Sequence, residues 1–514
     1  MIYNILEYLE KSSTCYPQKT AFQDEKRCIT YEELEKKAKM IGYALANKLK
    51  KRNKPIVVMM DKSVECLIAF FGVVYSGNFY VCIAPDMAEK RVKHILENLK
   101  PECVISTQAY KEKTIFGVEC CEYSELITKV ENDEMEKKLA KIREESIDTD
   151  PLYVLYTSGS TGIPKGSVIS HKSVIAYTEW VSETFHIDDT AIFGSQTPFY
   201  FSMSVLDIFT TIKNGATLQI IPKKYFSFPV KLLQYLEEKE VNIIYWVPSA
   251  LTIVANWKAL DYVKLTKLKT ILFAGEVMPT RQLNIWRKYL PNALYANLFG
   301  PTEITDIALY HILDREYKDE EPIPIGKACR NMNVFALNES NEKIKNDEIG
   351  ELYFRGSFVG FGYYNNEQKT KEAFVQNPLN SNYPEMVYRT GDLVRMNERG
   401  EYIYVGRKDF QIKHMGYRIE LGEIEAAVST CEKIDTNACL YDKDTERIVL
   451  IFQGKLEISE LHDYLANYLP TYMLPNDMVK VRSMPHNANG KIDRKLLEKK
   501  YIQEMNGENK DDIS

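Results

Sequence analysis

A segment rich in glycine and hydroxyl side chains spans residues 156–166 and reads YTSGSTGIPKG. Its three glycines allow backbone N–H groups to converge on an anion, and its serine and threonine hydroxyls add donors suited to nucleotide phosphates. A Walker A loop requires Gly-Lys-Ser/Thr at the start of a helix, whereas here Pro164 precedes Lys165 and Gly166 follows it. Taken alone, such a segment is more often a flexible polar loop, so the rest of the chain must decide.

Four more segments combine charged residues and glycines with polar or aromatic side chains. They are NLFGPTE at 297–303, YRTGDL at 388–393, GRKDFQIKHMGYRIELGEIE at 406–425 and NANGKIDRK at 487–495. Single residues in them have ordinary explanations: Asp392 could cap a turn, Arg407 could pair on the surface, and Lys491 could be an exposed lysine. All five segments, in this order, resemble the motifs of the ANL superfamily of adenylate-forming enzymes, which includes acyl-CoA synthetases, luciferases and adenylation domains of nonribosomal peptide synthetases. The resemblance covers nearly all 514 residues.

The resemblance implies a reaction in which a carboxylate attacks the α-phosphate of ATP. Because two anions must meet, cations and aligned donors have to offset the charge on the transferring phosphoryl group. By resemblance, Lys491 contacts both the substrate carboxylate and the α-phosphate, and Thr302 touches phosphate. Glu303 helps to hold Mg²⁺. These three residues are the catalytic set that the resemblance implies, and ATP and Mg²⁺ are the implied cofactors.

The nucleotide would be held by residues from most of the motifs. By resemblance, Phe299 stacks on adenine, and Asp392 with Arg407 holds the ribose hydroxyls, for which a carboxylate is a suitable acceptor. Asp409 matches the family's hinge, about which the C-terminal part of the chain would rotate. The nucleotide-binding residues implied in this way are Thr157, Ser158, Gly159, Ser160, Thr161, Gly162, Lys165, Gly275, Glu276, Asn297, Phe299, Gly300, Asp392 and Arg407.

The acid pocket departs from the family's pattern. In members that activate amino acids, an Asp follows the Phe of the segment matching FSMSVLDIF at 201–209 and holds the α-ammonium, but here that position is Ser202. A hydroxyl compensates a buried ammonium only in part, so an ordinary α-amino acid is in doubt. Asp306 either supplies the missing carboxylate, for an amine displaced from the α-position or a hydroxyl donor, or it pairs with a lysine or caps a turn. The matched pocket positions, of which the apolar ones could equally be core, are Ser202, Met203, Leu206, Tyr245, Leu272, Ala274, Leu298, Asp306 and Ile307.

The acyl group would pass to the thiol of coenzyme A or of a carrier protein. The segments LPTYMLP at 469–475 and NGKIDRK at 489–495 resemble carrier-loading adenylation domains and D-alanine-carrier ligases more than acyl-CoA synthetases. No phosphopantetheine site or condensation motif is present, so we expect a separate phosphopantetheinylated carrier protein. The sequence thus predicts an AMP-forming acid–thiol ligase that activates a small amino-acid-like or aryl acid. The alternatives are an acyl-CoA or aryl-CoA ligase and a catalytically silent nucleotide-binding regulatory protein.

Composition and charge argue against several other classes of protein. A net charge of -6 with 45% hydrophobic residues is typical of a globular protein without a nucleic-acid-binding surface. The sequence contains no C-x-x-C or H-E-x-x-H spacing, so we expect reduced cysteines and no transition-metal site. Glu7 and Glu10 interrupt the N-terminal stretch, and the apolar run 66–75 is too short to span a membrane. We therefore expect a cytoplasmic protein that does not bind membranes.

Alternating helices and strands must position these residues. Thr30 and Glu33 predict a capping box at a helix start, helices are expected over 64–75 and 89–99, and strands over 56–60 and 103–106. This alternation predicts an α/β fold of layered subdomains. From Ile349 onward, short β-branched and aromatic segments predict a β-rich subdomain, which a compact α+β unit follows. We predict a large N-terminal domain at 1–407, a small mobile C-terminal domain at 408–505 and a frayed tail at 506–514.

Overall fold

The computed structural model describes residues 2–107, 117–128, 133–158, 164–408, 411–485 and 492–502. The chain forms two compact units. The larger unit takes Met1–Pro85, Asn98–Tyr156 and Gly166–Lys408, and the smaller takes Asp86–Glu97, Thr157–Lys165 and Asp409–Ser514. Helices alternate with sheets in both, so the predicted α/β class, with a large N-terminal part and a smaller C-terminal part, is confirmed.

A nine-stranded sheet lies in the larger unit. Its six consecutive strands from β13 to β1 run parallel, and β11 and β12 bury every residue. Such strands are apolar along their whole length because helices cover both faces of a parallel sheet. In spatial order the strands are β15 (Lys327–Ala328), β14 (Leu309–Ile312), β13 (Leu294–Phe299), β12 (Thr270–Phe273), β11 (Ile243–Trp246), β9 (Ile192–Ser195), β10 (Thr217–Ile220), β1 (Thr20–Gln23) and β2 (Cys28–Thr30).

A second sheet has seven strands, and the apolar runs predicted at 56–60 and 103–106 form two of them, β3 and β5. Strands β3 and β4 bury every residue and pair in parallel. In spatial order the strands are β18 (Gly362–Tyr363), β8 (Lys165–Ser170), β7 (Pro151–Thr157), β4 (Phe79–Ile83), β3 (Pro55–Met59), β5 (Cys103–Ser106) and β6 (Cys120–Glu122).

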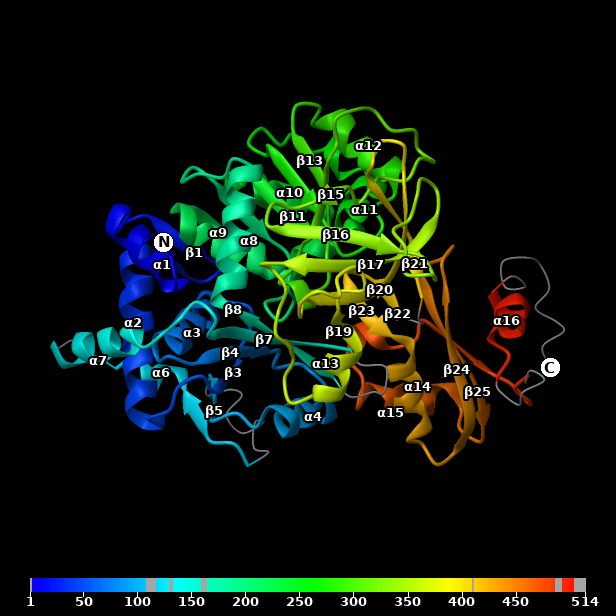
Figure 1. The fold of residues 1–514 in the computed structure, drawn as a ribbon, viewed down its shortest axis with the longest axis horizontal. Coiled ribbons are helices and arrows are strands. Elements are labelled where there is room, and N and C mark those ends of the chain that lie inside the picture. The colour runs from blue at the N-terminus through cyan, green and yellow to red at the C-terminus, as the bar shows by residue number, and fades with distance from the viewer. Residues whose placement is uncertain are drawn as a thin grey trace. The chain divides into compact units, whose positions relative to one another are not determined.

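Helices connect these strands where the apolar periodicity predicts them. Helix α2 (Tyr31–Leu49) starts at the predicted capping box, in which Thr30 Oγ1 accepts from the Glu33 N–H and Glu33 Oε2 accepts from the Thr30 N–H. Helices α3 (Val64–Tyr75) and α4 (Glu89–Leu99) have the predicted bounds, and Figure 1 shows α2 and α3 close to strands β3 and β4. The other helices outside the C-terminal part are α1 (Leu6–Cys15), α6 (Tyr123–Leu126), α7 (Asp133–Glu144), α8 (His171–Thr184), α9 (Ser204–Asn214), α10 (Pro229–Glu238), α11 (Pro248–Asn256), α12 (Thr280–Tyr289) and α13 (Glu367–Ala373).

The β-rich subdomain predicted from Ile349 onward is an antiparallel sheet. Strand β17 is buried at most of its positions, as expected for its β-branched and aromatic residues. Figure 1 shows β16 and β17 as neighbouring arrows of opposite direction. The strands are β16 (Met332–Leu337), β17 (Ile349–Gly356), β20 (Met386–Met396) and β19 (Phe374–Gln376) in spatial order, with β21 (Tyr402–Arg407) paired to β20.

The smaller unit has its own apolar core, in which Ile424 and Val428 of α14 pack with Leu450 and Phe452 of β25. A two-stranded and a three-stranded sheet frame this core. Its elements are β22 (Gln411–His414), β23 (Tyr417–Glu420), α14 (Leu421–Ser429), β24 (Ile434–Asp442), β25 (Arg447–Gly454), α15 (Ile458–Ala466), β26 (Asp477–Lys480) and α16 (Arg494–Leu497).

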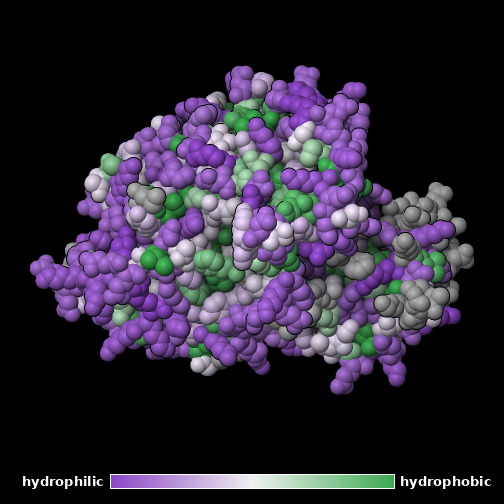
Figure 2. All heavy atoms as spheres, viewed as in Figure 1, coloured by the Kyte–Doolittle hydropathy of each residue, from purple (hydrophilic) through white to green (hydrophobic). Residues whose placement is uncertain are grey.

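Hydrophilic residues dominate the face of the molecule drawn in Figure 2, where apolar residues form small separate patches. In the described part of the chain, no helix is both long enough and apolar enough to cross a bilayer.

Helix α9 begins within the segment 201–209, which is predicted to line the acid pocket, and a tyrosine from α2 holds its C-terminal end. The buried Tyr31 hydroxyl lies 2.9 Å from the Thr211 carbonyl oxygen and 2.7 Å from that of Ala216. Because those carbonyls would lose their donor in an apolar setting, we expect Tyr31→Phe to lower the free energy of unfolding by about 1 kcal/mol. Urea denaturation measures the change. Tyr262→Phe, at a side chain that is 76% exposed, is the matched control, and equal stability of both variants would contradict the role of Tyr31.

Candidate active site

The carboxyl ends of β11, β12 and β13 lie at one edge of the nine-stranded sheet, because these neighbours are parallel. Open α/β sheets bind ligands at this edge. Tyr245 of β11 is the register partner of Leu272 of β12, Ala274 follows the end of β12, and Leu298 lies near the end of β13. All four side chains are buried, so the structure brings these predicted pocket residues together.

The loop after β13 folds back sharply on itself. A Cβ at Gly300 would lie 2.2 Å from the Asp306 carbonyl oxygen and 2.7 Å from the Ile307 Cα, so only glycine permits this approach. Thr305 has φ 74° and ψ -64°, and the Asp306 N–H donates to the Ile304 carbonyl at 2.9 Å. This is a tight turn that is strained for a β-branched residue. The Thr305 hydroxyl, which donates to the Phe358 carbonyl at 2.8 Å, helps to hold it, so the turn fixes the position of Asp306.

The Asp306 carboxylate is fully buried, and two tyrosines from different elements donate to its Oδ2 atom. Tyr177 of α8 donates at 2.8 Å and Tyr245 at 3.1 Å. Burial raises the pKa of Asp306 to about 7, against the lowering effect of hydrogen bonds from Tyr177, Tyr245 and Ser202. No basic side chain of the described residues contributes to this pKa, so the structure gives no support to a lysine pair.

Ser202, the residue in the position of the family's amino-acid-binding Asp, stands just before α9. The Thr302 hydroxyl donates to the Ser202 hydroxyl at 3.4 Å, and Ser202 also bonds to Asp306. Ser202 therefore lies between the predicted phosphate contact and the buried acid. The remaining pocket residues, Met203, Leu206 and Ile307, are buried as well.

Glu303 is completely buried, and its Oε1 atom accepts a hydrogen bond of 2.6 Å from the Tyr363 hydroxyl. Carboxylate oxygen is a ligand type that Mg²⁺ prefers, and one or two carboxylates suffice when substrate phosphates supply the other ligands. Glu303 therefore fits its predicted role in holding Mg²⁺. The described residues form no cluster of three or more metal-ligating side chains.

Asp392 and Arg407 form a buried ion pair across two antiparallel strands. They are register partners on β20 and β21, and Arg407 Nη1 donates to Asp392 Oδ1 at 2.8 Å. Their side chains are only 3% and 7% exposed, so Arg407 is no surface residue. The ring of Phe299, predicted to stack on adenine, has its centre 5.8 Å from that of Tyr404. Tyr404 lies on β21 as the register partner of Val394.

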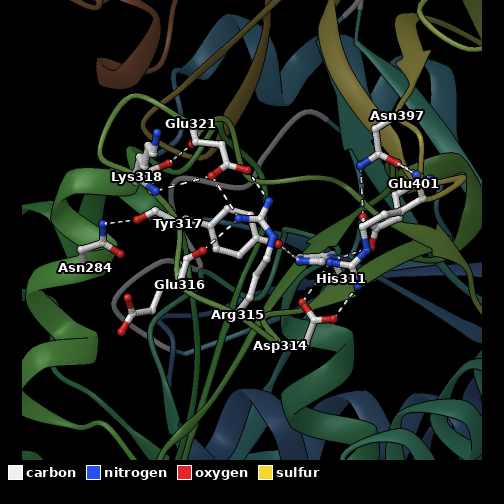
Figure 3. A network of polar contacts seen from close by, with 12 residues as sticks. Asn284, His311, Asp314, Arg315, Glu316, Tyr317, Lys318, Glu321, Asn397 and Glu401 are labelled. Carbon is white, nitrogen blue, oxygen red and sulfur yellow. Dashed lines mark hydrogen bonds and ion pairs between the residues drawn. The ribbon is translucent and has the colours of Figure 1, made fainter.

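Asn297 and Glu276, two predicted nucleotide-binding residues, also make hydrogen bonds to the backbone of other segments. The Asn297 amide donates to the Pro324 carbonyl at 2.9 Å, and Glu276 Oε2 accepts at 2.8 Å from the Ser249 N–H in the first turn of α11. Asn297 is the register partner of His311 on β14. Figure 3 shows His311 between Glu401 and Tyr317, at 2.8 Å and 2.6 Å. This polar network fixes the strand that lies beside Asn297.

The phosphate-binding segment is described only at its two ends. Thr157 Oγ1 is buried and has no hydrogen-bond partner in the described chain, so it has the capacity to bind an added oxygen. Ser158 Oγ donates to the Arg418 carbonyl at 2.6 Å, and Lys165 starts β8. Six predicted residues lie outside the described part, namely Gly159, Ser160, Thr161, Gly162, Asp409 and Lys491. Gly275, which follows Ala274, has φ 94°.

The sequence did not single out three buried polar residues around the pocket. Tyr177 bonds to Asp306 from α8, while Asp207 on α9 lies near Lys62, whose ammonium donates to the Ser195 carbonyl at 2.9 Å. Burial raises the pKa of Asp207 and lowers that of Lys62, and each opposes the shift of the other. Asp207 is not one of the matched pocket positions, and Lys62 lies outside the matched segments. Only the folded chain therefore reveals this pair.

Comparison with known proteins agrees with this geometry. The AMP-binding enzyme family matches residues 9–364. Zwittermicin A synthase ZmaJ of Bacillus cereus is 30% identical over 513 residues, which cover 96% of this chain and 94% of that protein. Tyrocidine synthase 1 of Brevibacillus parabrevis is 31% identical over 96% of this chain, which spans only 45% of that longer protein.

Two solved structures share the fold. The nonribosomal peptide synthetase protein PA1221, which contains adenylation and PCP domains, superposes with a TM-score of 0.82 at 22% identity, over 96% of this chain and 84% of that one. The fused adenylation–PCP di-domain NpsA-ThdA from Klebsiella oxytoca gives a TM-score of 0.80 at 19% identity, over 93% and 94% of the two chains.

The raised pKa of Asp306 predicts a pH-dependent stability. The native state binds the Asp306 proton more tightly than the unfolded chain, so this acid destabilises the fold increasingly as pH rises from 3.8 toward about 7. Asparagine carries no charge, so Asp306→Asn should melt at a higher temperature than the unsubstituted protein, with a gap that widens from about pH 5 to about pH 8.

Scanning calorimetry of the ligand-free proteins measures this gap. Asp314→Asn is the matched control, because a hydrogen bond from Arg399 lowers the pKa of the Asp314 carboxyl and its substitution should not stabilise the fold at high pH. A constant gap for Asp306→Asn would show that the carboxylate is not penalised by burial.

Proposed function

Because this chain belongs to the AMP-binding enzyme family and is an adenylate-forming ligase of the ANL superfamily, we propose that it activates a small carboxylic acid and loads it onto a carrier protein. The acid would be an amino acid, an amino-acid-like acid or an aryl acid. What supports this most is the run of five motifs in family order. Three of them contribute residues to the larger unit, namely Thr302, the buried Glu303 and the buried ion pair of Asp392 with Arg407.

In the first step, a substrate carboxylate oxygen attacks the α-phosphorus of ATP, an acyl-AMP forms and pyrophosphate leaves. Lys491 would neutralise both the carboxylate and the α-phosphate, and Thr302 would donate its hydroxyl to phosphate oxygen. Asp392, oriented by Arg407, would accept from the ribose hydroxyls, while Phe299 would pack on adenine. Mg²⁺, when held by Glu303, would offset charge on the phosphates.

In the second step, the thiol of a phosphopantetheine arm attacks the acyl carbon and AMP leaves. We propose a separate carrier protein as the donor of that thiol, because segments 469–475 and 489–495 resemble carrier-loading relatives. Asp409 would serve as the hinge between domains 1–407 and 408–505, so that Lys491 acts in the first step and the segment around Arg418 in the second.

The first step predicts acid-dependent exchange of pyrophosphate into ATP. We expect exchange with one class of acid from a panel of D- and L-amino acids, β-alanine, hydroxybenzoates and short fatty acids. Lys491→Ala should abolish it, since a transition-state cation is lost, and Asp392→Asn should raise the KM for ATP by about tenfold. Asp435→Asn, at an exposed position of β24, is the control. Unchanged exchange in Lys491→Ala would contradict the assigned role.

The second step predicts the nature of the acceptor. With the activated acid, thioester should form on a phosphopantetheinylated carrier protein much faster than on free coenzyme A, because only the carrier offers a protein surface to bind. Gel-based loading assays with a radiolabelled acid compare the two. An apo-carrier protein without its phosphopantetheine arm is the control, and equal or faster transfer to coenzyme A would identify an acyl-CoA ligase instead.

A further inference from the structure

We propose that the substrate carries an ammonium group at least two carbons away from its carboxylate, and that Asp306 binds this ammonium between Tyr177 and Tyr245. The inference rests on the proposed function, because it concerns the acid that is activated. It selects β-amino acids and amino-substituted aryl acids over α-amino acids and acids without an amine.

The charge of the buried Asp306 carboxylate favours an ammonium group as its ligand. Asp306 is 1% exposed and receives hydrogen bonds only from hydroxyl groups of the described residues, Tyr177, Tyr245 and Ser202. Hydroxyls stabilise a buried carboxylate but cannot neutralise it, and a buried charge without a partner of opposite sign is costly. A ligand ammonium would supply the missing positive charge, whereas a ligand hydroxyl would add only another neutral donor.

A second buried acid nearby provides an internal comparison. Asp207 is also 1% exposed, and the positive charge of Lys62 lowers its pKa. Asp306 has no such counterpart in the described chain, and its own charge raises the pKa of Asp207. Among the described residues a cation therefore accompanies one of the two neighbouring acids, and the other acid belongs to the matched pocket positions.

The position of Asp306 in the pocket, farther from Thr302 than Ser202 is, indicates where the amine lies on the substrate. Ser202 occupies the position from which relatives hold an α-ammonium, and it bonds to Thr302 on one side and to Asp306 on the other. If the substrate carboxylate meets the α-phosphate near Thr302, the acid at position 306 lies one hydrogen bond farther from it than an acid at position 202 would. An amine that reaches Asp306 must therefore sit farther along the substrate than the α-carbon.

The site has the capacity to accept such a group. A carboxylate offers about four acceptor positions, and the two tyrosines share one oxygen, Oδ2. The tyrosine rings are themselves favourable neighbours for a cation. Leu272, Ala274 and Leu298 add buried apolar surface nearby, which suits the carbon chain or ring between the two charged ends of the substrate.

The experiment measures kcat/KM for pyrophosphate exchange with matched acids: β-alanine against propionate, and 3-aminobenzoate against benzoate, with α-alanine as the positional control. We expect the amine-bearing member of at least one pair to be favoured over both its amine-free partner and α-alanine. Asp306→Asn should lower kcat/KM for that amine-bearing acid by about a hundredfold and leave its amine-free partner nearly unchanged, because only the former loses an ion pair. The Asp435→Asn variant should behave like the unsubstituted enzyme.

A second variant tests whether the position of the carboxylate sets the preferred position of the amine. Ser202→Asp combined with Asp306→Asn moves the carboxylate to the position nearer Thr302, so preference should shift toward α-alanine. A preference of the unsubstituted enzyme for amine-free acids or α-alanine, or an equal loss for both members of a pair in Asp306→Asn, would overturn the inference while adenylation stands. Absence of exchange with every acid, despite AMP binding measured by calorimetry, would overturn the proposed function itself and the inference with it.

Discussion

A buried carboxylate that no cation of the described residues accompanies is the constraint around which this site is organised. Asp306 stays in place because Gly300 lets the loop after β13 fold back and Thr305 accepts a strained turn. Tyr177 and Tyr245 then supply hydrogen bonds from a helix and a strand that are far apart in the sequence. Strained backbone and buried charge both cost stability, and both persist only where the surrounding structure holds them firmly.

The parallel sheet explains why residues from so many segments can serve one ligand. Since β11, β12 and β13 run in the same direction, the loops that follow them lie at a common edge. The antiparallel subdomain works differently, because it places Asp392 and Arg407 opposite each other on paired strands. In the proposed function, this rigid ion pair would orient ribose, and the loops at the sheet edge would set the choice of acid.

Local signals made much of this architecture predictable. The capping box at Thr30, the bounds of α3 and α4, and the change to antiparallel strands near Ile349 all follow from short sequence patterns. Of the two tyrosines that donate to Asp306, Tyr245 is a predicted pocket residue. Tyr177 could not be predicted, because it lies 129 positions away on an amphipathic helix with no motif around it. For the same reason the bond from Asn297 to the Pro324 carbonyl, which gives a predicted nucleotide contact a structural role, emerged only from the fold.

The energetic cost of burying the Asp306 carboxylate also gives a physical reason for selectivity among substrate acids. It therefore links the stability of the protein to its function. An apolar pocket discriminates weakly between acids of similar shape, but a buried polar group left unpaired by the wrong ligand discriminates strongly. An acid without an amine would bury Asp306 further while leaving it uncompensated, whereas a well-placed ammonium would relieve a penalty that the folded chain already carries. A substitution that removes the charge should therefore stabilise the protein and weaken its selectivity together, as expected where a binding site is built at the expense of stability.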